Sequence, residues 1–118
     1  MEVNQGDIYW VASKETDYIH PHVVIQDNVM NRSRIHTVVL CALTTNLKRA
    51  TLPGNVLLDA GEASLPKQSI VVVSQVSTVE RTQLGEYIGS LTEGRINQIL
   101  AGMQFVQRLT QRSETREA

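Results

Sequence analysis

Apolar positions along most of the chain fall in short β-branched runs that are separated by turn-forming residues. Runs of this kind predict strands rather than helices. Six strands are expected, at Asp7 to Ala12, His22 to Asp27, Ile35 to Leu43, Asn55 to Leu58, Ser69 to Ser77 and Tyr87 to Ser90. The segments NVMNRSR, TTNLKRATLPG and AGEASLPKQ are expected to be loops, and ERTQL one helical turn. The pattern predicts a mainly β domain, a small barrel or sandwich.

The end of the chain has a different period. Apolar residues recur there at spacings of three and four, as they do along one face of a helix. They are Ile96, Ile99, Leu100, Met103 and Val106. Thr92 is expected to cap this helix, and its apolar face is expected to dock on the sheet. Because the residues after Leu109 are polar and aperiodic, we expect one domain over residues 1–109 and a flexible tail over residues 110–118.

Composition narrows the class of protein. A chain of 118 residues with 42% hydrophobic and 19% charged residues is typical of one globular domain. The sequence contains no apolar stretch long enough for a membrane span and no secretory signal, so we expect a cytoplasmic protein that does not engage a membrane. Cys41 is the one cysteine and lies within the apolar run HTVVLCAL, where a thiol usually behaves as a small buried hydrophobe.

The net charge is −1, but the charges are unevenly distributed along the chain. Five acidic residues and Lys14 lie between Met1 and Asp27, whereas no acidic residue lies between Asn28 and Leu58. The basic residues of that second segment are Arg32, Arg34, Lys48 and Arg49. Two basic loops are therefore expected, either as an ordinary solvated surface or as a local phosphate-binding face.

Two of the three histidines, His20 and His22, flank Pro21 at the start of the second expected strand. In an extended chain their side chains point to one face. They can bind a metal with a third ligand from His36, Cys41 or a distant carboxylate, carry protons in phosphodiester cleavage, or simply end the strand. No second Cys or His motif has metal-ligand spacing, so we expect no metal and no cofactor.

Hydroxyl groups and cations adjoin after the third expected strand. Thr44 and Thr45 follow its apolar run and open the loop that contains Lys48 and Arg49. A phosphate can accept hydrogen bonds from a hydroxyl and from backbone N–H groups while a cation offsets its charge. A Thr at a strand end more often closes a turn. Ser74 has no evident base beside it and is a poor candidate for a nucleophile.

The order of these segments resembles the MazF/PemK family, the toxin half of bacterial toxin–antitoxin pairs. The resemblance runs from Gln5 to about Leu109. It rests on the segments GDIYWV, HPHVVIQDNVMNR, VVLCALTT and LPGNVLLDAGEASLPKQSIVVVSQVSTVERTQLGEYIGSL, followed by the helix. The resemblance implies a mainly β (α+β) fold, a small SH3-like twisted antiparallel barrel with a C-terminal helix. It also implies a homodimer that cuts single-stranded RNA by metal-independent acid–base chemistry.

The family motifs match this chain only in part. Where the family usually has Arg before the proline of RPVVV, this chain has His20, which can donate a proton but lacks the bidentate grip and permanent charge of a guanidinium. The hydroxyl after the third strand matches as Thr44. Gln75 and Thr78 match positions of the segment that often reads DQIRT.

Other family positions have changed. The carboxylate and the Arg of DQIRT are replaced by Ser74 and Ser77, and the first loop lacks the Gly-rich GxExxGxRP pattern. Members that use this carboxylate as a base therefore have no equivalent group here. We expect His22 or His36 to supply the missing base, with His20 as acid or phosphate stabiliser.

The sequence therefore predicts a toxin of a type II toxin–antitoxin system that acts as an endoribonuclease. Its expected catalytic residues are His20, Thr44 and His22, and its expected RNA-binding residues are Arg32, Arg34, Thr45, Lys48, Arg49 and Gln75. A disordered antitoxin segment is expected to compete with RNA for a basic groove between Arg32 and Arg49. A homodimer is expected because the resemblance implies one and because the apolar residues exceed what one small barrel covers. Examples are Ile70, Val72, Ile96 and Met103. The rival interpretation is a non-catalytic protein of the same fold that binds an antitoxin or another protein.

Overall fold

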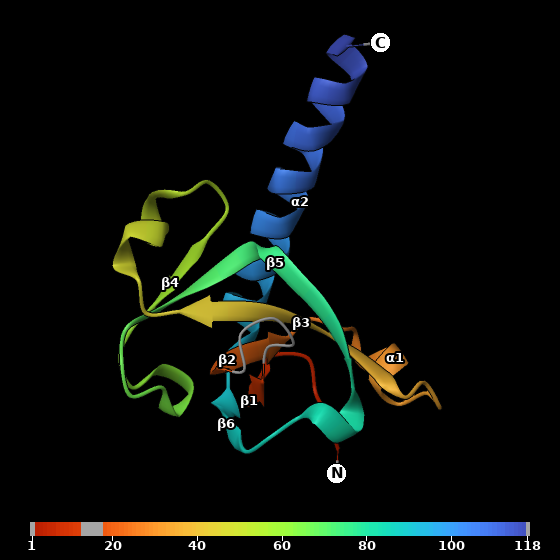
Figure 1. The fold of residues 1–118 in the computed structure, drawn as a ribbon, viewed down its shortest axis with the longest axis vertical. Helices are drawn as coiled ribbons and strands as arrows, with labels where there is room; N and C mark the ends of the chain where they lie inside the picture. The colour runs from red at the N-terminus through yellow and green to blue at the C-terminus, as the bar shows by residue number, and fades with distance from the viewer. Residues whose placement is uncertain (1, 13–17, 118) are drawn as a thin grey trace.

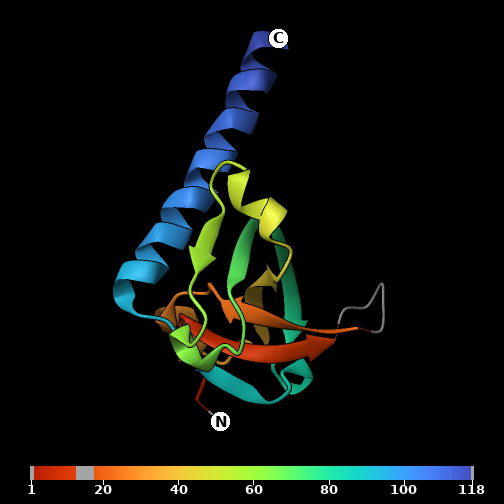
Figure 2. The same ribbon diagram turned by 90° about the vertical axis from the view of Figure 1, so that its left-hand side faces the viewer.

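The computed structural model describes residues 2–12 and 18–117, with side chains to residue 108. In this part of the chain six antiparallel strands form one sheet in the order β4-β5-β3-β2-β1-β6. The strands are β1 (Asp7–Ala12), β2 (Ile19–Val24), β3 (Thr37–Thr44), β4 (Val56–Leu58), β5 (Ser69–Glu80) and β6 (Tyr87–Ser90). The helices are α1 (Asn28–Asn31), η1 (Leu47–Thr51), η2 (Glu62–Ser64), η3 (Arg81–Gln83) and α2 (Glu93–Glu117). The predicted mainly β fold, a curled antiparallel sheet with a C-terminal helix, is confirmed (Figures 1 and 2).

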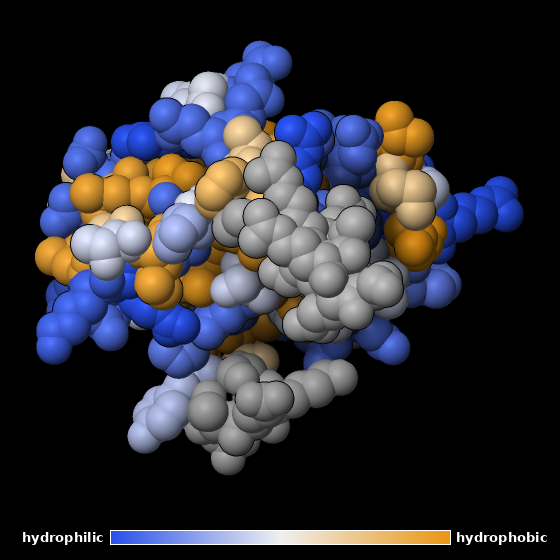
Figure 3. All heavy atoms as spheres, turned by 90° about the horizontal axis from the view of Figure 1, so that it is seen from above, coloured by the Kyte–Doolittle hydropathy of each residue, from blue (hydrophilic) through white to orange (hydrophobic). Residues whose placement is uncertain are grey.

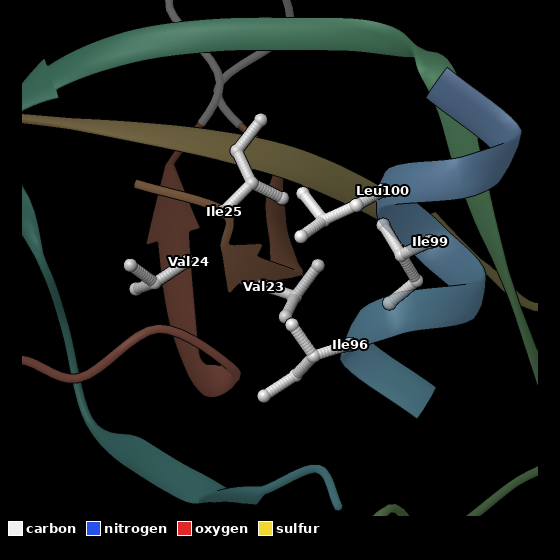
Figure 4. Close-up of a pocket in the computed structure, with 6 residues that line it drawn as sticks. All are labelled: Val23, Val24, Ile25, Ile96, Ile99 and Leu100. Carbon is white, nitrogen blue, oxygen red and sulfur yellow. The ribbon is translucent and has the colours of Figure 1, made fainter. Parts of the chain in front are cut away.

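Alternate residues of the strands face two separate cores, because successive side chains of a strand point to opposite sides. The core beneath α2 includes Ile8, Val23, Cys41, Leu43, Val71 and Ile99. The core on the other face includes Tyr9, Val11, Val24, Val38, Leu40, Val79 and Leu84. Figure 4 shows Val23 beside Ile96 and Ile99 of the helix, with Val24 farther away. The predicted docking of the helix on the sheet is thus confirmed.

Strand β2 begins at Ile19, earlier than the expected start at His22. Its pairing with β1 joins Val11 to His20 and Ala12 to Ile19, and backbone pairing of this kind does not require apolar side chains. Pro21 lies opposite Trp10 and has no N–H to donate. Strand β2 pairs with β3 through residues His22 to Val24, so Pro21 lies outside that ladder. Both histidines are therefore strand residues rather than loop residues.

Strand β5 is longer than expected and is interrupted at its middle. It runs to Glu80, beyond the expected end at Ser77. Along β3, Cys41 pairs with Val76 and Leu43 pairs with Val71, so residues 72–75 of β5 lie opposite Ala42 alone. An irregularity of this kind bends a strand and redirects its side chains.

Helix α2 begins as the sequence predicts. The Thr92 hydroxyl accepts a hydrogen bond from the Arg95 N–H at 3.3 Å, which confirms the expected cap. The helix does not end near Leu109 but continues to Glu117, and its C-terminal part projects away from the sheet (Figures 1 and 2). The flexibility of residues 110–118 and the domain limit at residue 109 stay predictions.

Short helices occupy segments that the sequence assigns to loops. α1 lies within NVMNRSR, and the Asp27 carboxylate caps it by accepting a hydrogen bond from the Val29 N–H at 2.8 Å. η1 lies within TTNLKRATLPG, and the Asn46 side chain accepts from the Lys48 N–H at its start. The one helical turn expected within ERTQL is present as η3.

Candidate nucleic-acid interface

Strands β2 and β3 bring His20, His22 and Thr44 to one face of the sheet. His22 lies opposite Ala42 on β3, and Thr44 ends that strand two residues beyond Ala42. Since residues two apart in a strand share a face, these side chains lie on the side of Val24 and Leu40, away from α2. The acid–base candidates and the candidate phosphate ligand therefore share one surface.

His22 is held by a hydrogen bond to its own strand. Its Nδ1 lies 2.9 Å from the carbonyl oxygen of His20. The His22 side chain is buried, whereas His20 is exposed. Burial lowers the pKa of His22 below 6.5, an effect that the bond to the His20 carbonyl partly opposes. The His22 imidazole is therefore neutral at pH 7.

Thr44 is positioned as the last residue of β3, immediately before η1. Its Oγ1 accepts a hydrogen bond from the Asn46 N–H at 3.2 Å. This bond closes the turn, as such threonines commonly do, and it uses an oxygen lone pair. The hydroxyl proton is left for a second bond, so closing the turn does not prevent Thr44 from donating to a phosphate oxygen.

The interrupted segment of β5 adds polar side chains to the same region. Ser74 and Gln75 are exposed and lie within residues 72–75, opposite Ala42. Ala42 in turn pairs with His22, so the three strands place His22, Ala42 and this segment in one row. Hydroxyl and amide groups of this kind can contact sugar or base edges, but they do not provide a carboxylate base.

The basic loop after β3 continues the same edge. Thr45 and Lys48 are exposed there. Arg49 is only partly exposed, and its Nε is buried without a hydrogen-bond partner among the described residues. Lys48 is therefore the more accessible cation for a phosphate next to Thr44.

The second basic loop lies at the opposite end of β3. His36 precedes the strand and Thr44 ends it, a separation of roughly 25 Å in a straight strand. The Arg32 guanidinium binds the Val3 carbonyl at 2.6 Å, the Asn4 side chain and the Glu2 carboxylate. The structure thus does not bring Arg32, Arg34 or His36 together with the His20 and Thr44 cluster.

One exposed aromatic residue was missed by sequence reasoning. The Tyr18 ring lies 6.4 Å from the His20 ring at an interplanar angle of 66°, and 71% of Tyr18 is exposed. An exposed aromatic face beside a cationic edge is a common platform for an unpaired base. The signal was present in the sequence as an aromatic residue two positions before His20, immediately before the start of β2.

Other titratable groups lie outside this site. Cys41 is fully buried, as the sequence predicts, and burial raises the pKa of its thiol to about 12. Among the residues the structure describes, no group of three or more His, Cys, Asp and Glu side chains is arranged so that it could hold a metal ion. Within the same residues, every helix is too short or too polar to cross a membrane.

Apolar side chains gather on the surface near η1 and β4. Figure 3 shows them in the region where η1 and β4 lie in Figure 1, with a smaller group near α1. The exposed residues on η1, β4 and their connection are Leu47, Leu52 and Leu57. Ile70 and Val72 are instead buried within the single chain, so the expectation that they are surplus to one barrel is wrong.

The sequence matches proteins named as endoribonucleases over most of its length. It is 30% identical over 111 residues to Endoribonuclease MazF6 of Mycobacterium tuberculosis, an alignment that covers 90% of this chain and 97% of that protein. It is 27% identical over 110 residues to Endoribonuclease EndoA of Bacillus subtilis, with 89% and 94% of the two chains covered.

Solved structures share the fold. A mycobacterial endoribonuclease in complex with its cognate antitoxin superposes with a TM-score of 0.76 at 24% identity, covering 91% of this chain and 96% of that one. MazF in a MazE–MazF structure from Deinococcus radiodurans gives 0.71 at 14% identity, covering 91% and 96%. The family model for the PemK-like, MazF-like toxin of type II toxin–antitoxin systems matches residues 4–106. The chain therefore belongs to this family of toxins.

Proposed function

We propose that this protein is the toxin of a type II toxin–antitoxin system and acts as an endoribonuclease on single-stranded RNA. The observation that carries the proposal is that His20 and Thr44 lie on one face of the neighbouring strands β2 and β3, with His22 opposite Ala42 between them. A proton donor and a hydroxyl donor beside an exposed cation, Lys48, supply the general acid and the phosphate-stabilising groups of phosphodiester cleavage without a metal. Similarity to proteins named as endoribonucleases supports the same activity.

In this reaction the 2′-hydroxyl oxygen of the RNA attacks the adjacent phosphorus, its proton passes to a general base, and the bond from phosphorus to the 5′-oxygen breaks. His20 donates a proton to the departing 5′-oxygen. Thr44 donates a hydrogen bond to a non-bridging phosphate oxygen, and Lys48 offsets the phosphate charge. The products are a 2′,3′-cyclic phosphate and a 5′-hydroxyl. Tyr18 supplies an aromatic face on which a base next to the cleaved bond stacks.

The proposal includes two protein partners. A second copy of the chain is expected to cover the apolar surface near η1 and β4, where Leu47 and Leu52 are exposed. The antitoxin is expected to be encoded beside the toxin. Its disordered segment is expected to bind the basic loop after β3, in competition with RNA. The toxin, the antitoxin and the RNA are expected to meet in the cytoplasm. Light scattering checks the dimer, because a mass near 13.1 kDa across micromolar concentrations would contradict it.

The activity itself is tested with purified protein, a mixed single-stranded RNA and an excess of EDTA. Cleavage that yields cyclic phosphate and 5′-hydroxyl ends is expected. Absence of cleavage under all conditions would favour the rival function, a binding module of the same fold, for which the loss of the family Arg and carboxylate at His20 and Ser74 is the supporting observation.

A further inference from the structure

His22 lies on the same face as His20 and Thr44 but has no role in the reaction described above. We propose that His22 is the general base of RNA cleavage and takes the proton of the 2′-hydroxyl through its Nε2 atom. The proposal rests on the proposed ribonuclease activity. It assigns the base in a chain that has Ser74 where relatives carry a carboxylate.

The hydrogen bond at Nδ1 determines which nitrogen can act. A backbone carbonyl only accepts hydrogen bonds, so the Nδ1 atom that lies 2.9 Å from the His20 carbonyl carries the proton. In the neutral ring the other nitrogen, Nε2, then has the lone pair. The bond therefore selects the tautomer that accepts a proton at Nε2 and fixes the orientation of the ring.

The surroundings of His22 keep the ring neutral. Tyr9 lies opposite it on β1, Ala42 opposite it on β3, and His20 two residues away on its own strand. None of these neighbours is a carboxylate, and burial raises the pKa of Tyr9 to about 12, so its phenol is uncharged. A protonated His20 further disfavours a second positive charge at His22. Among the described groups facing it, nothing stabilises the imidazolium except the His20 carbonyl.

The two histidines then divide the proton transfers of one reaction. The 2′-hydroxyl proton moves to His22 Nε2 as the oxygen bonds to phosphorus. The electron pair of the broken P–O bond stays on the 5′-oxygen, which takes the proton of His20. His22 leaves the step protonated and His20 neutral, and exchange with water restores both. His36 cannot take the place of His22 because it lies at the other end of β3.

The test compares wild type, His22→Gln, His20→Ala and His36→Gln on a defined single-stranded RNA in EDTA between pH 5 and 9. His22→Gln is expected to lose on the order of 10²-fold or more in kcat/KM. It should also lose the rising limb of the pH profile, which is the increase of kcat/KM with pH on the acidic side. His20→Ala is expected to lose the falling limb. His36→Gln is expected to match wild type, and circular dichroism checks that each variant is folded.

A second substrate separates the base from the acid without relying on a variant's stability. In an RNA with sulfur in place of the scissile 5′-oxygen, the leaving group no longer needs a proton. Wild type should then lose its falling limb and keep its rising limb, and the substrate should rescue His20→Ala but not His22→Gln.

The outcomes distinguish the two proposals. If wild type does not cut either substrate, the ribonuclease activity itself is wrong. If wild type cuts and folded His22→Gln retains its rate within a few-fold or its rising limb, the activity stands and His22 is not the base. Rescue of His22→Gln by the sulfur substrate would assign His22 to the leaving group instead and would also overturn the proposal.

Discussion

Gly102 of helix α2 lies against Gly54 so closely that a Cβ atom on Gly102 would come within 2.1 Å of the Gly54 carbonyl oxygen. Gly54 itself has a φ of +85°, which favours glycine. Two glycines thus allow the helix to cross the segment between η1 and β4. Gly102→Ala is expected to lower the free energy of unfolding by about 1–3 kcal/mol, because the helix must shift away from backbone atoms. Urea denaturation measures the change.

Gly94→Ala is the matched control for that substitution. Gly94 lies in the same helix, and the nearest atom to its added Cβ is the Thr92 hydroxyl oxygen at 3.9 Å. Alanine there is expected to leave stability unchanged or to raise it by up to about 1 kcal/mol. Equal destabilisation by both alanines would show that the close approach of Gly102 to Gly54 is not the cause of the effect.

The start of α2 is fixed to η2 by an ion pair whose strength depends on pH. Arg95 Nε lies 2.6 Å from Glu62 Oε1, and Arg95 Nη2 lies 3.0 Å from Oε2. The hydrogen bond from Arg95 is the main reason that the pKa of Glu62 lies below 4.5 in the folded state. The unfolded chain therefore takes up this proton first as the pH falls. The stability contributed by Glu62 is complete above about pH 4.5 and is lost as the pH drops through the folded pKa.

Glu62→Gln is accordingly expected to cost about 1 kcal/mol at pH 7 and to make acid unfolding between pH 5 and 3 less steep. Urea midpoints across this range measure both effects. Glu93→Gln, a change at an exposed carboxylate in the first turn of the same helix, serves as control. If Glu93→Gln flattened the acid limb as much as Glu62→Gln, the Arg95 contact would not be the cause.

The positions of strands along the chain depend on patterns that a sequence displays, and β1 and β6 lie where the sequence places them. The start of β2 was missed because Ile19 and His20 are exposed and Pro21 is a poor strand residue, so only pairing with β1 extends the strand to them. The interruption of β5 was missed because SIVVVS reads as one continuous run. Its irregular pairing with β3 has no local signal.

The candidate site was predictable only where residues adjoin along a strand. Two residues two apart in one strand share a face, so the pairing of His20 with His22 follows from spacing alone. His36 also carries an imidazole, and only the register of β2 against β3, with His22 opposite Ala42, shows that His36 lies far from His22. The tautomer of His22 depends on one carbonyl oxygen and requires coordinates.

His22 should also leave a signature in stability. The folded pKa of His22 lies below its unfolded value of 6.5, chiefly because burial disfavours the charged ring. As the pH falls below about 6.5, the unfolded chain binds a proton that the folded chain does not, so the free energy of unfolding decreases towards the folded pKa. His22→Gln is expected to remove this slope between pH 7 and 5. Urea denaturation of wild type and His22→Gln at intervals of about half a pH unit measures this slope. If the slope of the free energy of unfolding against pH were the same in both, the buried His22 ring would not be neutral in the folded state.

The salt dependence of RNA binding should identify the cation that contacts phosphate. With a 2′-O-methyl RNA that cannot be cut, Lys48→Gln is expected to reduce the slope of log K against log salt by about 0.7, the effect of one lost phosphate contact on a single strand. Arg108→Gln, at an exposed position on α2, is expected to leave the slope unchanged. A reduced slope in Arg34→Gln instead of Lys48→Gln would place the RNA at the other end of β3.

The residue before Pro21 should control how cleavage responds to high pH. An imidazole loses its proton within the range from pH 5 to 8, whereas a guanidinium keeps it throughout. If His20 is the acid, cleavage should therefore fall with rising pH, because the imidazole must keep its proton in order to donate it. Thr44→Ala should lower the rate without moving either limb, since a hydroxyl donor does not titrate in this range.

His20→Arg separates proton donation from phosphate binding at the same position. If His20 donates the proton, the arginine variant should lose most of its activity at pH 6 but bind the 2′-O-methyl RNA at least as tightly, because the positive charge is retained. If His20 only stabilises the phosphate, the variant should be at least as active as wild type and should no longer fall off above neutrality. Single-turnover rates and Kd values at pH 6 and 8 distinguish these cases. Cleavage that survives His20→Ala at both pH values would remove this residue from the mechanism.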